Sequence, residues 1–311
     1  MMTDVSVNSL PSEESGVKLS RSLQAAVGIS ALMGAALAAA PTATAAAPAA
    51  TPQVYVALGD SMASGPLIPN PTGPLACARS THNYAHVMAA ALGIPTLRDV
   101  TCSGASTSDM TNPQPLSIAG VSAGTAPPQF DALSADTTLV TLTIGGNDVG
   151  LVGVGQNCMQ LNPFAAPCKN KYVVNGVDSV AARSDAFAPK LAAVLDGIHQ
   201  RAPLARVLVT GYGLYLKAGG CWPVQPVLGS DATWLQSEVD YLNQVIAATS
   251  ASHAAQYVDV RTPSAGHDSC QAESARWVEG YVPLTLAAPL HPNQAGEAAY
   301  AGIVGAAVAA G

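Results

Sequence analysis

Short apolar runs alternate with longer amphipathic stretches once the first fifty residues are passed. Four runs rich in Val, Ile, Leu, Thr and Tyr have the length and composition of strands buried on both faces of a parallel sheet. These predicted strands span residues 54–58, 138–144, 205–212 and 256–260. Apolar residues recur at helical spacing in the stretches between and after them. These predicted helices span residues 82–93, 184–202, 231–253 and 292–311, and Asp231 is the expected N-cap of the third.

Strands that alternate with helices predict a doubly wound α/β domain around a parallel sheet. In such sheets functional groups gather at the carboxyl ends of the strands, which places Ser61 and Asn147 on one rim. Segments rich in Pro, Gly and Cys separate the predicted elements, and we expect them to be loops. They span residues 66–76, 108–128, 149–178 and 217–230.

The composition excludes two broad classes of protein. Hydrophobic residues make up 49% of the 311 residues and charged residues only 11%, which argues for a folded chain with a weakly charged surface. The net charge is −7 and no cluster of Lys and Arg is present, so we expect no nucleic-acid partner.

The first 45 residues have the features of a signal peptide. Lys18 and Arg21 precede an apolar run over residues 25–40, and the small residues Ala43 and Ala45 form an A-x-A site, so we place cleavage after Ala45. The alternative is an uncleaved anchor, but the run is shorter than the roughly 20 residues that a membrane-spanning helix needs. We therefore expect a secreted protein with a signal peptide at 1–45, a flexible lead-in at 46–53 and a single domain at 54–311.

All six cysteines follow the signal. An even number in an exported chain indicates three disulfides, although six cysteines allow 15 pairings and reduced buried thiols are the alternative. Their spacing does not match a zinc site, and we expect neither a metal nor a cofactor. The cysteines are Cys77, Cys102, Cys158, Cys168, Cys221 and Cys270.

Four short polar blocks are candidate sites. Ser61 lies in Gly-Asp-Ser, where the first strand should turn into a helix, and Asn147 lies in Gly-Gly-Asn-Asp after the second strand. A helix start directs amides at a developing charge, and an Asn side chain can donate to an oxyanion. Gly104, in a Ser-rich loop, could present a backbone N–H without a Cβ, and His291 precedes Pro292 ahead of the last helix. Taken singly, each block also fits an ordinary turn, loop or surface histidine.

Together the blocks resemble the GDSL, or SGNH, serine hydrolase family. They occur in the family's order, and the resemblance covers nearly all of the chain after the signal. It implies a three-layer α/β/α sandwich around a parallel sheet, a flavodoxin-like arrangement. The cysteine spacings resemble those of secreted actinobacterial esterases and lipases of this family, which implies pairing in sequence order: Cys77–Cys102, Cys158–Cys168 and Cys221–Cys270.

The resemblance also implies a role for each site residue. Ser61 would be the nucleophile and His291 the general base and later acid, because a serine hydroxyl is a weak nucleophile until an imidazole takes its proton. The backbone N–H groups of Ser61 and Gly104 and the side chain of Asn147 would form the oxyanion hole.

One position departs from the family pattern. The family usually has Asp three residues before the histidine, where this chain has Ala288. We expect the main-chain carbonyl of Ala288 or Pro289 to orient His291 instead, and Asp268 is a rival orienting group. The carboxylates next to the candidate residues, Asp60 and Asp148, are interpreted as structural groups that accept N–H bonds in their turns.

These inferences predict a secreted serine esterase or lipase that hydrolyses acyl esters through an acyl-enzyme on Ser61. Alternatives on the same fold are a phospholipase A and a carbohydrate O-deacetylase, and a non-catalytic binding protein is the alternative from another class. Apolar loops favour lipid-like or simple acyl esters over acetylated sugars. We expect a monomer that acts on a small-molecule or lipid ester and contacts lipid surfaces transiently.

Overall fold

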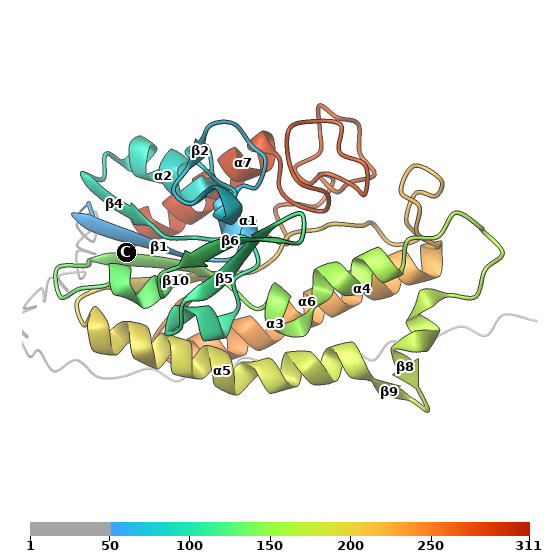
Figure 1. The fold of residues 1–311 in the computed structure, drawn as a ribbon, viewed down its shortest axis with the longest axis horizontal. Coiled ribbons are helices and arrows are strands. Elements are labelled where there is room, and N and C mark those ends of the chain that lie inside the picture. The colour runs from blue at the N-terminus through green and yellow to red at the C-terminus, as the bar shows by residue number, and fades with distance from the viewer. Residues whose placement is uncertain (1–50) are drawn as a thin grey trace, which may run out of the picture. The chain divides into compact units, whose positions relative to one another are not determined.

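A five-stranded parallel sheet forms the centre of the protein (Figure 1). The computed structural model describes residues 51–311, so the predicted signal peptide and residues 46–50 of the lead-in lie outside the described residues. The strand order is β11-β10-β7-β1-β4, and every neighbouring pair is parallel. The strands are β1 (Val54–Gly59), β4 (Thr96–Asp99), β7 (Leu139–Thr143), β10 (Arg206–Thr210) and β11 (Gln256–Val258).

Helices cover both faces of the sheet. Alternate residues of β1 point to opposite faces. Val56 packs with the cluster that includes α5 (Ser179–Arg201) and α6 (Gly229–Ser252), whereas Tyr55 packs with the cluster that includes α2 (Tyr84–Leu92) and α7 (Gln294–Ala309). Figure 1 shows these two helix layers on opposite sides of the strands, and the three-layer α/β/α fold is thus confirmed. The other helices are α1 (Ser61–Ser64), α3 (Gly146–Val149) and α4 (Leu151–Asn157).

The four strands and four helices expected from the sequence are present, with ends shifted by a few residues. The sequence pattern did not predict the edge strand β4, and three of the expected loops, 66–76, 108–128 and 149–178, contain regular structure. Residues 108–128 hold the hairpin of β5 (Gln114–Ile118) and β6 (Val121–Ala126). Residues 149–178 hold α4 and the hairpin of β8 (Val173–Val174) and β9 (Val177–Asp178), while β2 (Pro71–Thr72) and β3 (Arg79–Ser80) form a third short hairpin.

The predicted N-cap of α6 is wrong. The helix begins at Gly229 with Leu228 at the N-cap, so Asp231 lies inside the first turn. Its buried carboxylate accepts hydrogen bonds from the backbone N–H groups of Cys168 and Lys169, at 2.8 and 3.1 Å. Asp231 therefore anchors a distant loop rather than its own helix, which a local capping pattern cannot indicate.

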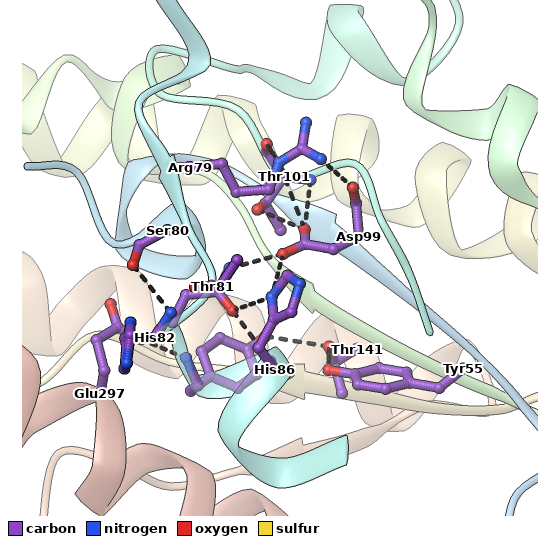
Figure 2. Close-up of polar contacts among 12 residues, drawn as sticks. Tyr55, Arg79, Ser80, Thr81, His82, His86, Asp99, Thr101, Thr141 and Glu297 are labelled. Atoms are coloured by element: carbon purple, nitrogen blue, oxygen red, sulfur yellow. Dashed lines mark hydrogen bonds and ion pairs between the residues drawn. The ribbon is translucent and has the colours of Figure 1, made fainter. Parts of the chain in front are cut away.

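A buried carboxylate organises the region around α2 and β4 (Figure 2). Asp99, at the end of β4, accepts hydrogen bonds from Asn83 Nδ2 at 2.7 Å and from Thr101 Oγ1 at 2.7 Å. Arg79 and His86 lie beside the same carboxylate, at 3.8 and 3.2 Å. Because Asn83 is also the N-cap of α2, this cluster fixes the start of that helix against the sheet edge.

Three disulfides close loops at the periphery of the sheet, in the pairing that the resemblance implies. They join Cys77 to Cys102, Cys158 to Cys168 and Cys221 to Cys270. Among the helices of residues 51–311, none combines the length and apolar character that crossing a membrane requires.

Candidate active site

The first candidate residue lies on a tight strand-to-helix turn. Strand β1 ends at Gly59, whose φ is +143° and whose place a Cβ could not take, because it would lie 2.5 Å from the carbonyl oxygen of Thr143. Asp60 then caps α1 by accepting from the backbone N–H of Met62 at 2.9 Å. Ser61 is the first residue of the helix, so its own N–H has no acceptor within the helix.

Ser61 and His291 are in hydrogen-bond contact, although 230 residues separate them. The Nε2 atom of His291 lies 2.7 Å from the Oγ atom of Ser61, and both residues are buried. The Nδ1 atom lies 2.7 Å from the carbonyl oxygen of Pro289. A carbonyl oxygen only accepts, so Nδ1 carries the proton of the neutral ring and Nε2 is left to accept from the serine hydroxyl.

Burial favours the neutral form of this imidazole. Desolvation lowers the pKa of His291 below its usual 6.5, and the hydrogen bond to the Pro289 carbonyl offsets part of that effect. The ring is thus able to accept a proton at neutral pH, which is what a general base for Ser61 requires.

The other two candidate orienting groups are engaged elsewhere. The carbonyl oxygen of Ala288 accepts from the backbone N–H of His291 at 3.2 Å rather than from the ring. The carboxylate of Asp268 accepts from the backbone N–H of Cys270 at 2.9 Å and from Gln271 at 2.8 Å.

Asn147 reaches the same rim from the neighbouring strand, as the carboxyl-end rule predicts. It lies in α3, just beyond β7, and its Nδ2 donates to the carbonyl oxygen of Ala105 at 2.8 Å. The second hydrogen of that amide is left for another acceptor. In Figure 1, α1 and α3 lie at the same end of the sheet.

Gly104 directly precedes the residue that Asn147 contacts. Its φ is +82°, and within residues 51–311 its N–H has no hydrogen-bond acceptor. Ser61 and Asn147 line one pocket, and Gly104 is not among the residues that line it. The structure thus brings the Gly104 loop next to Asn147.

The acidic neighbours of the candidate residues hold the turns in place. Besides capping α1, Asp60 accepts from the hydroxyl of Tyr212 at 2.7 Å, and burial raises its pKa to about 7 even though these hydrogen bonds lower it. Asp148 accepts from the backbone N–H of Thr107 at 3.0 Å, which ties the Ser-rich loop to α3.

Sequence reasoning missed Tyr212, which links the two halves of the site. Its hydroxyl accepts from the backbone N–H of Gly146 at 2.7 Å while donating to Asp60. The turn that carries Ser61 is thereby connected to the turn that carries Asn147. Tyr212 follows strand β10, so the rule that placed Ser61 and Asn147 at the carboxyl ends of their strands could have indicated it as well.

An apolar pocket opens beside Ser61. Its volume is about 690 Å³ including the mouth, and its wall comes from α4, α6, the segment after β10 and the loop before His291. Within residues 51–311, no three His, Cys, Asp or Glu side chains gather as metal ligands would. Apart from Asp60, Ser61 and Asn147, the lining residues are Met62, Gly146, Leu151, Val152, Gly155, Tyr212, Tyr215, Leu216, Leu235, Gln236, Val239, Tyr281 and Leu290.

Comparison with known proteins gives a consistent result. Residues 57–299 match the sequence model of the GDSL-like lipase/acylhydrolase family. The chain is 36% identical to Lipase 2 of Streptomyces coelicolor over 258 residues, which cover 80% of this chain and 83% of that protein. It is 31% identical to a lipase of Streptomyces rimosus over 244 residues, which cover 78% of this chain and 82% of that one.

Two solved structures share the fold at 28% sequence identity. Phospholipase A1 from Streptomyces albidoflavus superposes with a TM-score of 0.65, covering 82% of this chain and 99% of that one. The extracellular lipase from Streptomyces rimosus superposes with a TM-score of 0.63 at the same coverage.

Proposed function

Because the chain belongs to the GDSL-like lipase/acylhydrolase family, we propose that it is a secreted carboxylic ester hydrolase that works through an acyl-enzyme on Ser61. The observation that carries this proposal is the 2.7 Å contact between Ser61 Oγ and His291 Nε2, beside an apolar pocket that Ser61 lines. A nucleophile in contact with an oriented base is the arrangement that acyl transfer requires.

The reaction proceeds in two halves. His291 takes the Ser61 proton as Oγ attacks the ester carbonyl carbon, and the carbonyl oxygen becomes an oxyanion that the N–H groups of Ser61 and Gly104 and the side chain of Asn147 stabilise. His291 then protonates the leaving alcohol. In the second half His291 takes a proton from water as the water oxygen attacks the acyl carbon, and it returns that proton to Ser61 Oγ as the acid leaves.

The backbone carbonyl of Pro289 takes the place of the carboxylate that is the third member of a serine hydrolase triad. Its carbonyl oxygen holds the Nδ1–H of His291 and so keeps Nε2 directed at Ser61. A carbonyl supplies no negative charge, so the pair Ser61 and His291 acts as a dyad with a neutral orienting group.

The pocket favours esters of apolar acids. Its wall consists largely of aliphatic and tyrosine side chains, which suit an acyl chain better than an acetylated sugar. A phospholipase A activity is the second candidate, and the observation that favours it is the superposition on the phospholipase A1 of Streptomyces albidoflavus over 99% of that chain.

Export and the mode of action are part of the proposal. Three disulfides fit an oxidising compartment, and the structurally similar Streptomyces rimosus protein is an extracellular lipase. We propose that the mature chain is a monomer and contacts lipid surfaces transiently, and sedimentation of the mature chain tests its oligomeric state.

The test is hydrolysis of p-nitrophenyl esters from acetyl to palmitoyl by the oxidised mature chain. Ser61→Ala is expected to lower kcat by at least about 10³-fold, because the nucleophile is lost. Asn147→Ala is expected to lower kcat by about 10²–10³-fold with little change in KM, because the oxyanion exists only in the transition state. Folded protein without activity on any ester, or with activity that survives Ser61→Ala, would overturn the proposal.

A further inference from the structure

Four loop segments near the pocket contain no charged side chain. They are residues 66–70, 159–167, 218–228 and 280–290, and all lack Asp, Glu, Lys and Arg in a chain whose charged residues make up 11%. Figure 1 shows the second and third of them beside the start of α6. Loops at a protein surface are usually polar, so this absence calls for a physical reason.

These segments also carry most of the exposed large apolar side chains. Phe164 is 93% exposed, Leu161 80% and Leu286 71%. Apolar side chains exposed to water do not stabilise a monomer, whereas contiguous exposed apolar surface is typical of an interaction site. The exposed apolar residues in the four segments are Leu67, Met159, Leu161, Phe164, Trp222, Val224, Val282, Leu284 and Leu286.

Backbone and side-chain hydrogen bonds join the four segments into one surface. The N–H of Ala288 donates to the carbonyl oxygen of Pro66 at 2.9 Å, which connects the first and last segments. The N–H of Tyr281 donates to Gln225 at 2.9 Å, which connects the last segment to the third. The indole N–H of Trp222 donates to the carbonyl oxygen of Gln160 at 3.2 Å, which connects the third to the second. We call this joined surface the apolar rim.

The apolar rim is continuous with the pocket at Ser61. Tyr281 and Leu290 belong to the segment 280–290 and also line the pocket. The hydroxyl of Tyr281 further donates to the carbonyl oxygen of Gly155 in α4, at 2.8 Å. Whatever covers the rim therefore lies next to the pocket that Ser61 lines.

We propose that the apolar rim docks the enzyme on the surface of a zwitterionic phospholipid aggregate, with the pocket mouth facing the lipid. The inference rests on the proposed function, since it places the ester-bearing lipid at the entrance. The four segments of the rim carry no charge of their own, and the chain is acidic overall, so apolar burial drives the binding. Binding is accordingly insensitive to salt and gains nothing from anionic lipid.

The test is co-sedimentation of the full mature chain with vesicles of ether-linked phosphatidylcholine, which has no ester to hydrolyse. Leu161→Ser and Leu286→Ser are each expected to lower the partition coefficient at least about fivefold, because each removes a large apolar side chain from the lipid contact. Leu204→Ser is the matched control: Leu204 is 75% exposed, but it lies in the turn before β10, at the opposite end of the strands. Its partition coefficient should equal that of the wild type.

Three results would overturn the inference. They are no vesicle binding by the wild type, an equal loss in the Leu204→Ser control, and binding that requires anionic phosphatidylglycerol or disappears at high salt. A dimer in solution that Leu161→Ser dissociates, without vesicle binding, would assign the rim to a second copy of the chain instead. Hydrolysis of soluble p-nitrophenyl butyrate depends on Ser61 and His291 and not on vesicle binding. The two assays therefore distinguish failure of the lipid-docking proposal from failure of the proposed function.

Discussion

At the scale of single residues, the distinctive feature of the site is the neutral partner of His291. In a serine hydrolase triad a carboxylate both fixes the tautomer and stabilises the imidazolium, whereas the carbonyl of Pro289 does only the first. Burial destabilises the charged form of the ring, and only the dipole of the Pro289 carbonyl stabilises it. The pKa of His291 therefore lies below 6.5.

This electrostatic balance predicts the acid limb of the pH profile. Below its pKa, His291 is protonated at Nε2 and cannot accept the Ser61 proton, so kcat/KM should fall as pH decreases through a midpoint below 6.5. The measurement is kcat/KM for p-nitrophenyl butyrate between pH 4 and pH 8. An acid limb with its midpoint above 6.5 would mean that a negative group stabilises the imidazolium, contrary to the contacts described above.

The residues of the site differ in how far sequence alone could predict them. Ser61 and Asn147 follow strands and could be placed on one rim from the pattern, but nothing local relates His291 to a residue 230 positions away, and only the resemblance paired them. Whether the carbonyl of Ala288 or that of Pro289 orients the His291 ring depends on the local backbone turn. There Leu290 adopts a φ of +59° and the backbone N–H of His291 occupies the Ala288 carbonyl, which no residue pattern encodes.

At the scale of elements, burial decided which strands could be predicted. Strands β1, β7 and β10 are apolar runs because both of their faces are covered by helices. Strand β4 has a neighbour on one side only, and its sequence Thr-Leu-Arg-Asp ends in the polar cluster of Asp99, so it lacks the apolar signature. The hairpin of β5 and β6 is rich in Ser, Gly and Ala and lacks it as well.

Helix α7 carries a buried carboxylate that links it to α2. Glu297 is fully buried in the first turn of α7, and its Oε2 accepts from the backbone N–H of Tyr84, the first residue of α2, at 2.7 Å. Its Oε1 has no hydrogen-bond partner among residues 51–311. Burial with one partner raises the pKa of Glu297 well above 4.5.

The raised pKa predicts a pH-dependent loss of stability. Above pH 4.5 the unfolded chain releases this proton while the folded chain retains it, so the free energy of unfolding should fall as pH rises from 4.5 toward the folded-state pKa. Glu297→Gln keeps the acceptor for Tyr84 and removes the titration. In urea unfolding at several pH values, the free energy of unfolding of the variant relative to the wild type should therefore increase as pH rises. Parallel curves for the two proteins would rule out a protonated Glu297.

At the scale of the whole molecule, disulfides hold the loops that surround the site. The bond between Cys221 and Cys270 spans 49 residues and fastens the segment 218–228, which contributes to the apolar rim. The bond between Cys158 and Cys168 spans only 10 residues. In the chain-entropy account, a longer closed loop restricts the unfolded chain more and stabilises the fold more.

The loop lengths predict an order of stabilisation. Replacing both Cys221 and Cys270 with Ala is expected to lower the free energy of unfolding by about 4 kcal/mol, against about 3 kcal/mol for the pair Cys158 and Cys168. Urea unfolding of the two double variants, with the remaining disulfides intact, measures the difference. A larger loss for the shorter loop would show that local packing, rather than chain entropy, dominates.

Covalent trapping with diethyl p-nitrophenyl phosphate, followed by peptide mass spectrometry, tests directly whether Ser61 is a nucleophile that His291 activates. Attack by Ser61 Oγ on phosphorus expels p-nitrophenolate and leaves a stable diethylphosphoryl serine. We expect one p-nitrophenolate released per chain, the adduct on the peptide that contains Ser61, and loss of labelling in both Ser61→Ala and His291→Ala. Labelling at another residue, or labelling of Ser61 at an unchanged rate in His291→Ala, would contradict the dyad.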